Sequence, residues 1–241
     1  MRVPVLKRCR ARLAGFRTAM PGLLLLLSSI VALPQAAEAA FGTCPSSQAS
    51  MRNAGVATLV ASVFDSTTTD GYHVSYDLPA GHVFTAQPGC LCGAWVEATD
   101  LFDVTGVPAG TSVPLTAILT MDGTVSGPCV PQCGGDVDCR ISSGAVQDTK
   151  FIQVPDPPGP ASVHDVASIP VSIVAGTPVE IRYYVHGQRS VGGDNSTITT
   201  GQLSFTGLPK GAVVVSCQGF SSAGATPARP MNWGALKAIY R

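Results

Sequence analysis

The sequence predicts an all-β fold, an antiparallel β-sandwich, for most of its 241 residues. Three observations lead to this prediction: apolar and polar residues alternate in short runs, turn motifs separate the runs, and long helical patterns are missing. Val, Thr, Ile and Tyr fill the runs, as is typical of strands with one solvent-facing side. A jelly-roll-like or Ig-like pair of sheets is expected to bury their apolar faces.

The alternation is clearest in three runs. Residues 72–78, 113–121 and 179–186 each place their apolar side chains on one face of an expected strand. Residues 202–205 and 213–217 are shorter examples. Outside these runs, the same motif of an apolar residue, Pro, any residue and Gly recurs at 78–81, 107–110 and 208–211. Proline presets φ for a turn and glycine accepts positive φ, so each copy predicts a connector between strands.

Three segments depart from this pattern. Residues 126–141 hold three cysteines among glycines and prolines, which predicts a cross-linked, cysteine-rich loop. The proline-rich stretch 155–160 is either a bridge between strands or a seam between two halves, and one domain is favoured. Residues 221–230 predict a linker, and 232–241 a short C-terminal helical tail with Trp233, Leu236 and Tyr240 at helical spacing.

The N-terminus has the pattern of a signal peptide. Six basic residues precede an apolar run over 20–33, and Ala37 and Ala39 are the small residues that signal peptidase requires. The apolar run is shorter than the roughly 20 residues of a membrane span, so no transmembrane anchor is expected in the mature chain. The predicted organisation is a signal peptide over 1–39, a β-sandwich domain over 40–220 and a tail over 221–241, in a secreted or periplasmic protein.

Removing residues 1–39 leaves nine basic and 14 acidic residues, because the segment holds six of the 15 basic residues and one of the 15 acidic ones. A mature chain with this acidic excess and without a Lys/Arg cluster is not expected to bind nucleic acid. Seven cysteines remain, and export favours disulfides over zinc. The candidates are Cys44, Cys90, Cys92, Cys129, Cys133, Cys139 and Cys217. Cys44 and Cys217 are positioned to tie the termini together, Cys129 or Cys133 to close onto Cys139, and one thiol is left over.

No catalytic, cofactor-binding or metal site is predicted. The sequence lacks Gly-x-Ser-x-Gly, the P-loop, the dinucleotide fingerprint and His-Glu-x-x-His. His73, Ser75 and Asp77 share one strand face, but alternate residues lie about 6.6 Å apart, too far for a triad. Asp136 and Asp138 offer two carboxylates where calcium needs six to eight oxygen ligands.

Outward-facing aromatic residues are the remaining candidates for a binding site. Trp95 and Glu97 share one face of an expected strand, and the alternation in 179–186 turns Tyr184 outward. Aromatic rings stack on the faces of sugar rings, so these three residues form a possible binding face for a polysaccharide or a cell-surface partner. Packing in the core or at a strand edge is the competing interpretation.

Two stretches of turn motif and strand, 107–117 and 203–213, resemble those of uncharacterised bacterial secreted β-sandwich proteins, some of which carry a C-terminal sorting anchor. No such apolar anchor is expected after residues 232–241 of this chain. The resemblance implies a fold and a compartment and carries over no catalytic residue. We expect an exported structural or binding module; the alternative is a secreted hydrolase with a site assembled from distant strands.

Overall fold

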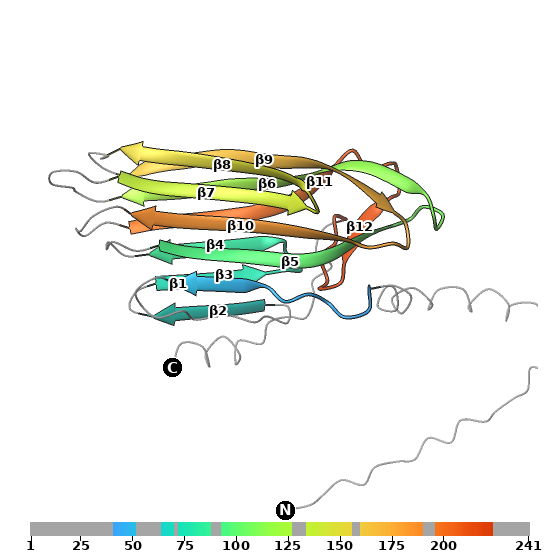
Figure 1. Cartoon of the computed structure of the whole chain (residues 1–241), viewed down its shortest axis with the longest axis horizontal. Coiled ribbons are helices and arrows are strands. Elements are labelled where there is room, and N and C mark those ends of the chain that lie inside the picture. The colour runs from blue at the N-terminus through green and yellow to red at the C-terminus, as the bar shows by residue number, and fades with distance from the viewer. Residues whose placement is uncertain are drawn as a thin grey trace, which may run out of the picture. The chain divides into compact units, whose positions relative to one another are not determined.

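The computed structural model, which describes residues 41–51, 64–69, 72–87, 93–126, 134–155, 160–189 and 196–223, is a sandwich of two antiparallel sheets (Figure 1). One buried apolar cluster takes side chains from both sheets. The all-β sandwich predicted from the alternation is therefore confirmed.

Sheet A is the nearer sheet in Figure 1. Its strands, in spatial order, are β1 (Gln48–Met51), β5 (Gly93–Thr105), β10 (Val179–Arg189), β7 (Gly134–Ser143) and β8 (Val146–Pro155). A further strand, β12 (Val213–Ser216), pairs with the end of β5. Sheet B has the spatial order β2 (Phe64–Thr69), β3 (Tyr72–Asp77), β4 (His82–Gln87), β11 (Ser196–Thr206), β6 (Ser112–Ser126) and β9 (Ala161–Val174).

The three clearest runs of alternating residues form strands as predicted, and their apolar residues point into the core. From Val113 to Met121 strand β6 buries every second side chain, and these are Val113, Leu115, Ala117, Leu119 and Met121. Strand β10 does the same with Ile181, Tyr183 and Val185. Each sheet thus covers the core with one face and presents the other to solvent, as expected for antiparallel sheets.

The repeated proline–glycine motif forms the predicted turns. In the first copy, the backbone N–H of Gly81 donates a 3.0 Å hydrogen bond to the carbonyl oxygen of Leu78. The glycines of the three copies, Gly81, Gly110 and Gly211, have φ values of 66°, 81° and 84°. Residues with a Cβ rarely adopt such values, which accounts for glycine at this place in the motif.

The prediction of a loop extending from 126 through 141 is wrong in its second half. Residues from Gly134 onward form β7, which pairs with β10 on one side and β8 on the other. Val137, Cys139 and Ile141 are fully buried. The cysteines and the Gly134–Gly135 pair obscured an alternation that is present in the sequence, whereas residues 127–133 lie outside the described part of the chain.

One disulfide is present among the described residues. It joins Cys44 to Cys217, with 5.7 Å between the two Cα atoms, and so links the ends of the domain as expected. Cys139, by contrast, is a free thiol buried in the core, so the expected closure of Cys129 or Cys133 onto it is wrong. Burial and the nearby Asp165 carboxylate raise the pKa of this thiol to about 12, which keeps it protonated and unreactive.

Several predictions fall on residues that the structure does not describe. These are the signal peptide over 1–39, the tail over 224–241, and Cys90, Cys92, Cys129 and Cys133. Within the described ranges, no helix has the length and apolar character needed to cross a membrane. The division of the chain into signal peptide, sandwich and tail stays a prediction.

Candidate functional site

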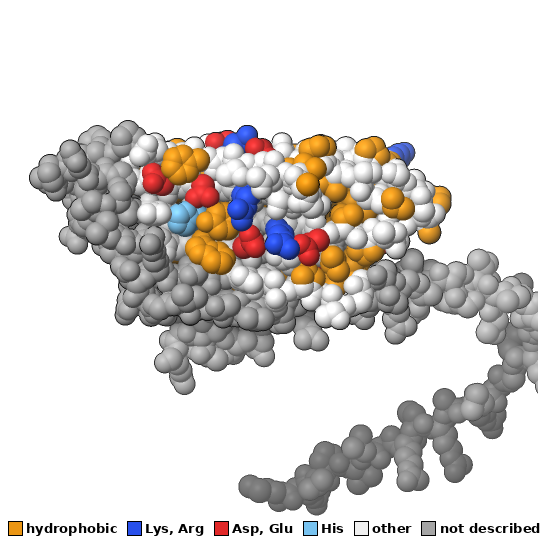
Figure 2. Space-filling view, viewed as in Figure 1, with side chains coloured by type: hydrophobic (Ala, Val, Ile, Leu, Met, Phe, Trp, Pro, Cys, Tyr) orange, Lys and Arg blue, Asp and Glu red, His pale blue; other side chains and the backbone are white. Residues whose placement is uncertain are grey.

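The outer face of sheet A gathers aromatic and charged side chains from four neighbouring strands (Figure 2). We call this surface the aromatic face and define it by residues of β5, β10, β7 and β8. They are Trp95 and Glu97, Tyr184 and His186, Asp138 and Arg140, and Phe151. The register places them together, because residues paired across antiparallel strands point to the same side of a sheet.

Three rings lie next to one another on this face. The ring centroids of Trp95 and Tyr184 are 6.0 Å apart with an interplanar angle of 37°. Those of Tyr184 and His186 are 6.2 Å apart at 30°. Both pairs are within the range of favourable aromatic contacts, so the rings hold each other in position over the strands.

An ion pair lies beside the rings. The Nη2 atom of Arg140 donates a 2.9 Å hydrogen bond to Oε2 of Glu97, across the intervening strand β10. The guanidinium also lies over the ring of Tyr184, with its Cζ atom 5.0 Å from the ring centroid. A cation over an aromatic face is attracted by the ring electrons, so these contacts fix Arg140 as well as the ring.

A hydrogen bond between His186 and Asp138 connects β10 and β7. Nδ1 of His186 lies 2.7 Å from Oδ1 of Asp138, and both side chains are about four-fifths covered, at 18% and 20% exposure. An ionised carboxylate only accepts hydrogen bonds, so Nδ1 is the donor. Nε2 points toward Gly93, where a Cβ atom would lie only 2.8 Å from it. Glycine at this position therefore leaves room for the imidazole.

The electrostatic setting keeps the tyrosine neutral. Burial raises the pKa of the Tyr184 phenol well above its usual range; the charge of Asp138 adds to the rise, and Arg140 opposes it. Burial also raises the pKa of Asp136, which lies on the same side of β7, with His186 opposing the shift and Asp138 adding to it. Tyr184 consequently offers a hydroxyl that can both donate and accept a hydrogen bond at neutral pH.

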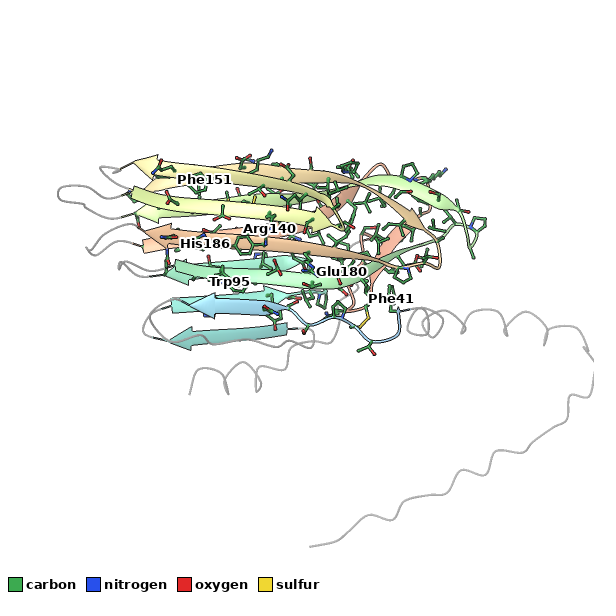
Figure 3. The ribbon with its side chains drawn as sticks, in the orientation of Figure 1. Phe41, Trp95, Arg140, Phe151, Glu180 and His186 are labelled. Carbon is green, nitrogen blue, oxygen red and sulfur yellow. A yellow bond between two sulfur atoms is a disulfide. The ribbon has the colours of Figure 1, made fainter. Side chains whose placement is uncertain are left out.

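Phe151 is the most exposed part of the aromatic face. Its side chain is 61% exposed, although a phenylalanine ordinarily gains from burial. It stands on β8 at the border of sheet A, on the same side as the rings of β5 and β10 (Figure 3). A large apolar side chain that is this exposed, on the same face as the rings of Trp95 and Tyr184, is typical of an interaction surface.

The structure brings the three predicted binding residues, Trp95, Glu97 and Tyr184, onto one surface. Sequence reasoning missed the remaining members. Phe151 lies on a strand that was not predicted, and Asp138 was assigned to a loop. The signal for Asp138 was its place between Val137 and Cys139, both buried.

The other residues considered from the sequence have local roles. The ring of His73 packs against Phe84 with 5.3 Å between centroids. Oδ1 of Asp77 accepts a 3.1 Å hydrogen bond from the backbone N–H of Ala80 and so supports the turn that follows β3. In the described ranges, no three His, Cys, Asp or Glu side chains are grouped closely enough to hold a metal ion.

No protein-family model matches the chain, and no curated protein is significantly similar to it. The resemblance to secreted β-sandwich proteins therefore stays a prediction. Among solved structures, one titled "CBM4 structure and function" aligns at 15% identity with a TM-score of 0.25, over 58% of this chain and 91% of the other. At that TM-score the similarity supports no inference about function.

Proposed function

We propose that this protein is an exported, non-catalytic binding module that holds polysaccharide on the aromatic face. The observation that supports this proposal most strongly is the exposed ring of Phe151, which lies on the same side of sheet A as Trp95 and Tyr184. Folding does not require any of these rings to face solvent, because the opposite face of the sheet supplies the core. Phe151 is exposed and the rings of Trp95 and Tyr184 are half-buried, and a surface that keeps all three on its solvent side is best explained by a ligand that covers them.

Polysaccharide suits this surface better than a purely apolar partner does. A sugar ring has one face of C–H groups, which stacks on an aromatic ring, and hydroxyls around its edge. Between the rings stand the carboxylates of Glu97 and Asp138 and the guanidinium of Arg140. Carboxylates accept hydrogen bonds from hydroxyls and guanidinium groups donate to them, so the surface offers partners for both parts of a sugar.

The test begins with protein exported by a bacterial host from the full-length gene, for which we expect an intact mass that starts at Ala40. Affinity electrophoresis then measures its retardation in gels that contain different soluble polysaccharides. Retardation by at least one of them is expected, with a loss of about tenfold or more in affinity for Trp95→Ala. The matched control is Ile198→Ala, which truncates a 42% exposed side chain on the outer face of sheet B.

Two outcomes contradict the proposal. If Trp95→Ala and Ile198→Ala bind every retained polysaccharide as the wild type does, the aromatic face is not the binding surface. If the polysaccharide is shortened during incubation, with release of new reducing ends, the protein is the hydrolase that is the alternative function. The partly covered His186–Asp138 pair is the observation that favours this alternative, because a hydrogen-bonded imidazole of this kind can act as a general base.

A further inference from the structure

The members of the aromatic face form two rows that run across the strands. In the first row Trp95 is paired with His186, His186 with Asp138, and Asp138 with Phe151. The row therefore crosses four adjacent strands in direct register, with a ring at each end (Figure 3). Three strand spacings of about 4.8 Å separate its ends, which gives the row a length of about 14 Å.

The second row lies beside the first, one pair of residues further along the strands. It consists of Glu97, Tyr184, Arg140 and Thr149, again in direct register. The contact between Trp95 and Tyr184 joins the two rows at one end. At the other end the first row finishes with the ring of Phe151, whereas the second row finishes with the polar Thr149. The first row therefore has an aromatic ring at both ends and the second does not.

The charges around the rows are predominantly negative. Four carboxylates, those of Glu97, Asp136, Asp138 and Glu180, stand on the outer faces of β5, β7 and β10. Two guanidinium groups oppose them, and each is already engaged: Arg140 with Glu97 at 2.9 Å and Arg182 with Glu180 at 2.7 Å. The surface has a net charge of −2 with His186 neutral, so it repels anions and leaves no unpaired cation of these rows to attract them.

Building on the proposed function, we infer that the ligand is an uncharged polysaccharide whose chain lies across strands β5, β10, β7 and β8, along the row from Trp95 to Phe151. A single sugar covers one ring of the row, whereas a chain of several sugars covers both terminal rings and the polar pair between them. His186 and Asp138 lie between the rings, where they face the hydroxyls of the sugars that bridge the gap.

Two properties follow from this arrangement. Affinity must rise with oligosaccharide length until the chain spans the row and then level off, because further sugars find no further ring of the row. Polymers with carboxylates or sulfates must bind less well than neutral polymers of similar backbone. This difference in affinity must be largest at low salt, where the charges are least screened.

The experiment measures affinity by isothermal titration calorimetry of the exported protein. The ligands are neutral cello-, xylo- and manno-oligosaccharides, from monosaccharide to hexasaccharide. Polygalacturonate and alginate serve as anionic comparisons. For the neutral series that binds, we expect Phe151→Ala to weaken the long oligosaccharides about tenfold and to leave the monosaccharide unchanged. Ile198→Ala is the control, and circular dichroism of each variant checks that the sandwich is intact.

The outcomes separate this inference from the function on which it rests. If no glycan binds, both are overturned. If oligosaccharides bind through Trp95 but Phe151→Ala has no effect at any length, the function stands and the direction of the chain is wrong. If an anionic polymer binds more tightly than the neutral ones, the uncharged class of ligand is wrong. If a monosaccharide binds tightly and longer oligosaccharides bind no better, the inference that the ligand lies along the first row is wrong.

Discussion

The outer face of sheet A and the outer face of sheet B cover the same core but carry different side chains. Sheet A presents the rings, carboxylates and guanidinium groups of the aromatic face. The long strands β6, β9 and β11 of sheet B present mainly hydroxyl groups, with isolated aliphatic side chains such as Ile198 and Val166. The contact between Nδ1 of His164 and Oδ1 of Asp122, at 2.7 Å, has both side chains more than 60% exposed.

This difference separates what folding requires from what it leaves free. Alternation makes the inner face of each strand apolar, and both sheets meet that requirement with Val, Ile and Tyr side chains among others. The outer face is then constrained by little beyond solubility and strand propensity. Hydroxyl groups satisfy both on the long strands of sheet B, and the outward rings of His73 and Phe84 on β3 and β4 pack against each other. The 61% exposed ring of Phe151 on sheet A has no such contact among the described residues and needs an explanation other than stability.

The largest expected effect comes from releasing the border of sheet A. Cys44 lies before β1 and Cys217 lies after β12, and both of these strands pair with β5, which carries Trp95. The disulfide spans 173 residues of sequence, so in a chain-entropy model its removal lowers the free energy of unfolding by about 5 kcal/mol. The double variant Cys44→Ser with Cys217→Ser, followed by guanidinium denaturation, measures this loss.

The same variant tests whether sheet A depends on the bond more than sheet B does. Hydrogen exchange is expected to accelerate first in β1, β5 and β12, while the amides of β6 and β11 remain protected until global unfolding. Equal acceleration in both sheets, or a loss below about 1 kcal/mol, would show that the disulfide does not support the aromatic face in particular.

A second effect concerns the carboxyl buried beneath the aromatic face. Asp100 lies on β5, is fully buried and accepts a 2.8 Å hydrogen bond from the backbone N–H of Leu101. Burial raises its pKa to about 6, although the hydroxyl of Ser216 and the N–H of Leu101 oppose the shift. The folded protein therefore binds this proton more tightly than the unfolded chain does. Its stabilising contribution is complete below about pH 4 and is lost as the pH rises through about 6.

The consequence is a pH-dependent gain from Asp100→Asn. At pH 7 the wild type keeps a buried carboxylate, so the variant is expected to be more stable by up to about 3 kcal/mol; near pH 4 this advantage disappears. Urea denaturation of both proteins between pH 4 and 7 measures the difference. A constant difference across this range would mean that Asp100 titrates as it does in the unfolded chain.

The comparison of the two faces also shows which parts of the molecule can be predicted from sequence. Inward positions such as Val185 and Leu119 follow from a local period of two residues. The membership of the aromatic face does not, because it depends on pairing Trp95 with His186, residues that are far apart in the chain, and on the register of the β7–β8 hairpin, which pairs Phe151 with Asp138. Outward orientation was predictable for Trp95 and Tyr184, whereas their assembly with His186, Asp138 and Phe151 required the register between strands.

The smallest effect lies inside sheet B. Thr199 is fully buried on β11, and its Oγ1 atom has no hydrogen-bond partner among the residues that the structure describes. Valine has nearly the same shape and lacks the unsatisfied hydroxyl, so Thr199→Val is expected to raise the free energy of unfolding by about 1 kcal/mol. Binding at the aromatic face should not change, because the substitution leaves the outer surface of sheet A as it is.

The neighbouring residue provides the control. Thr200 points outward from the same strand, and its hydroxyl donates a 3.1 Å hydrogen bond to the carbonyl oxygen of Asp122. Thr200→Val removes a bond that is made and is expected to leave stability unchanged or slightly lower. Thermal denaturation should thus give a higher Tm for Thr199→Val than for the wild type, and an equal or lower Tm for Thr200→Val. If Thr199→Val destabilises the protein instead, the hydroxyl of Thr199 has a partner such as a buried water. The inner face of sheet B would then hold its polar groups by defined hydrogen bonds, as the outer face of sheet A does.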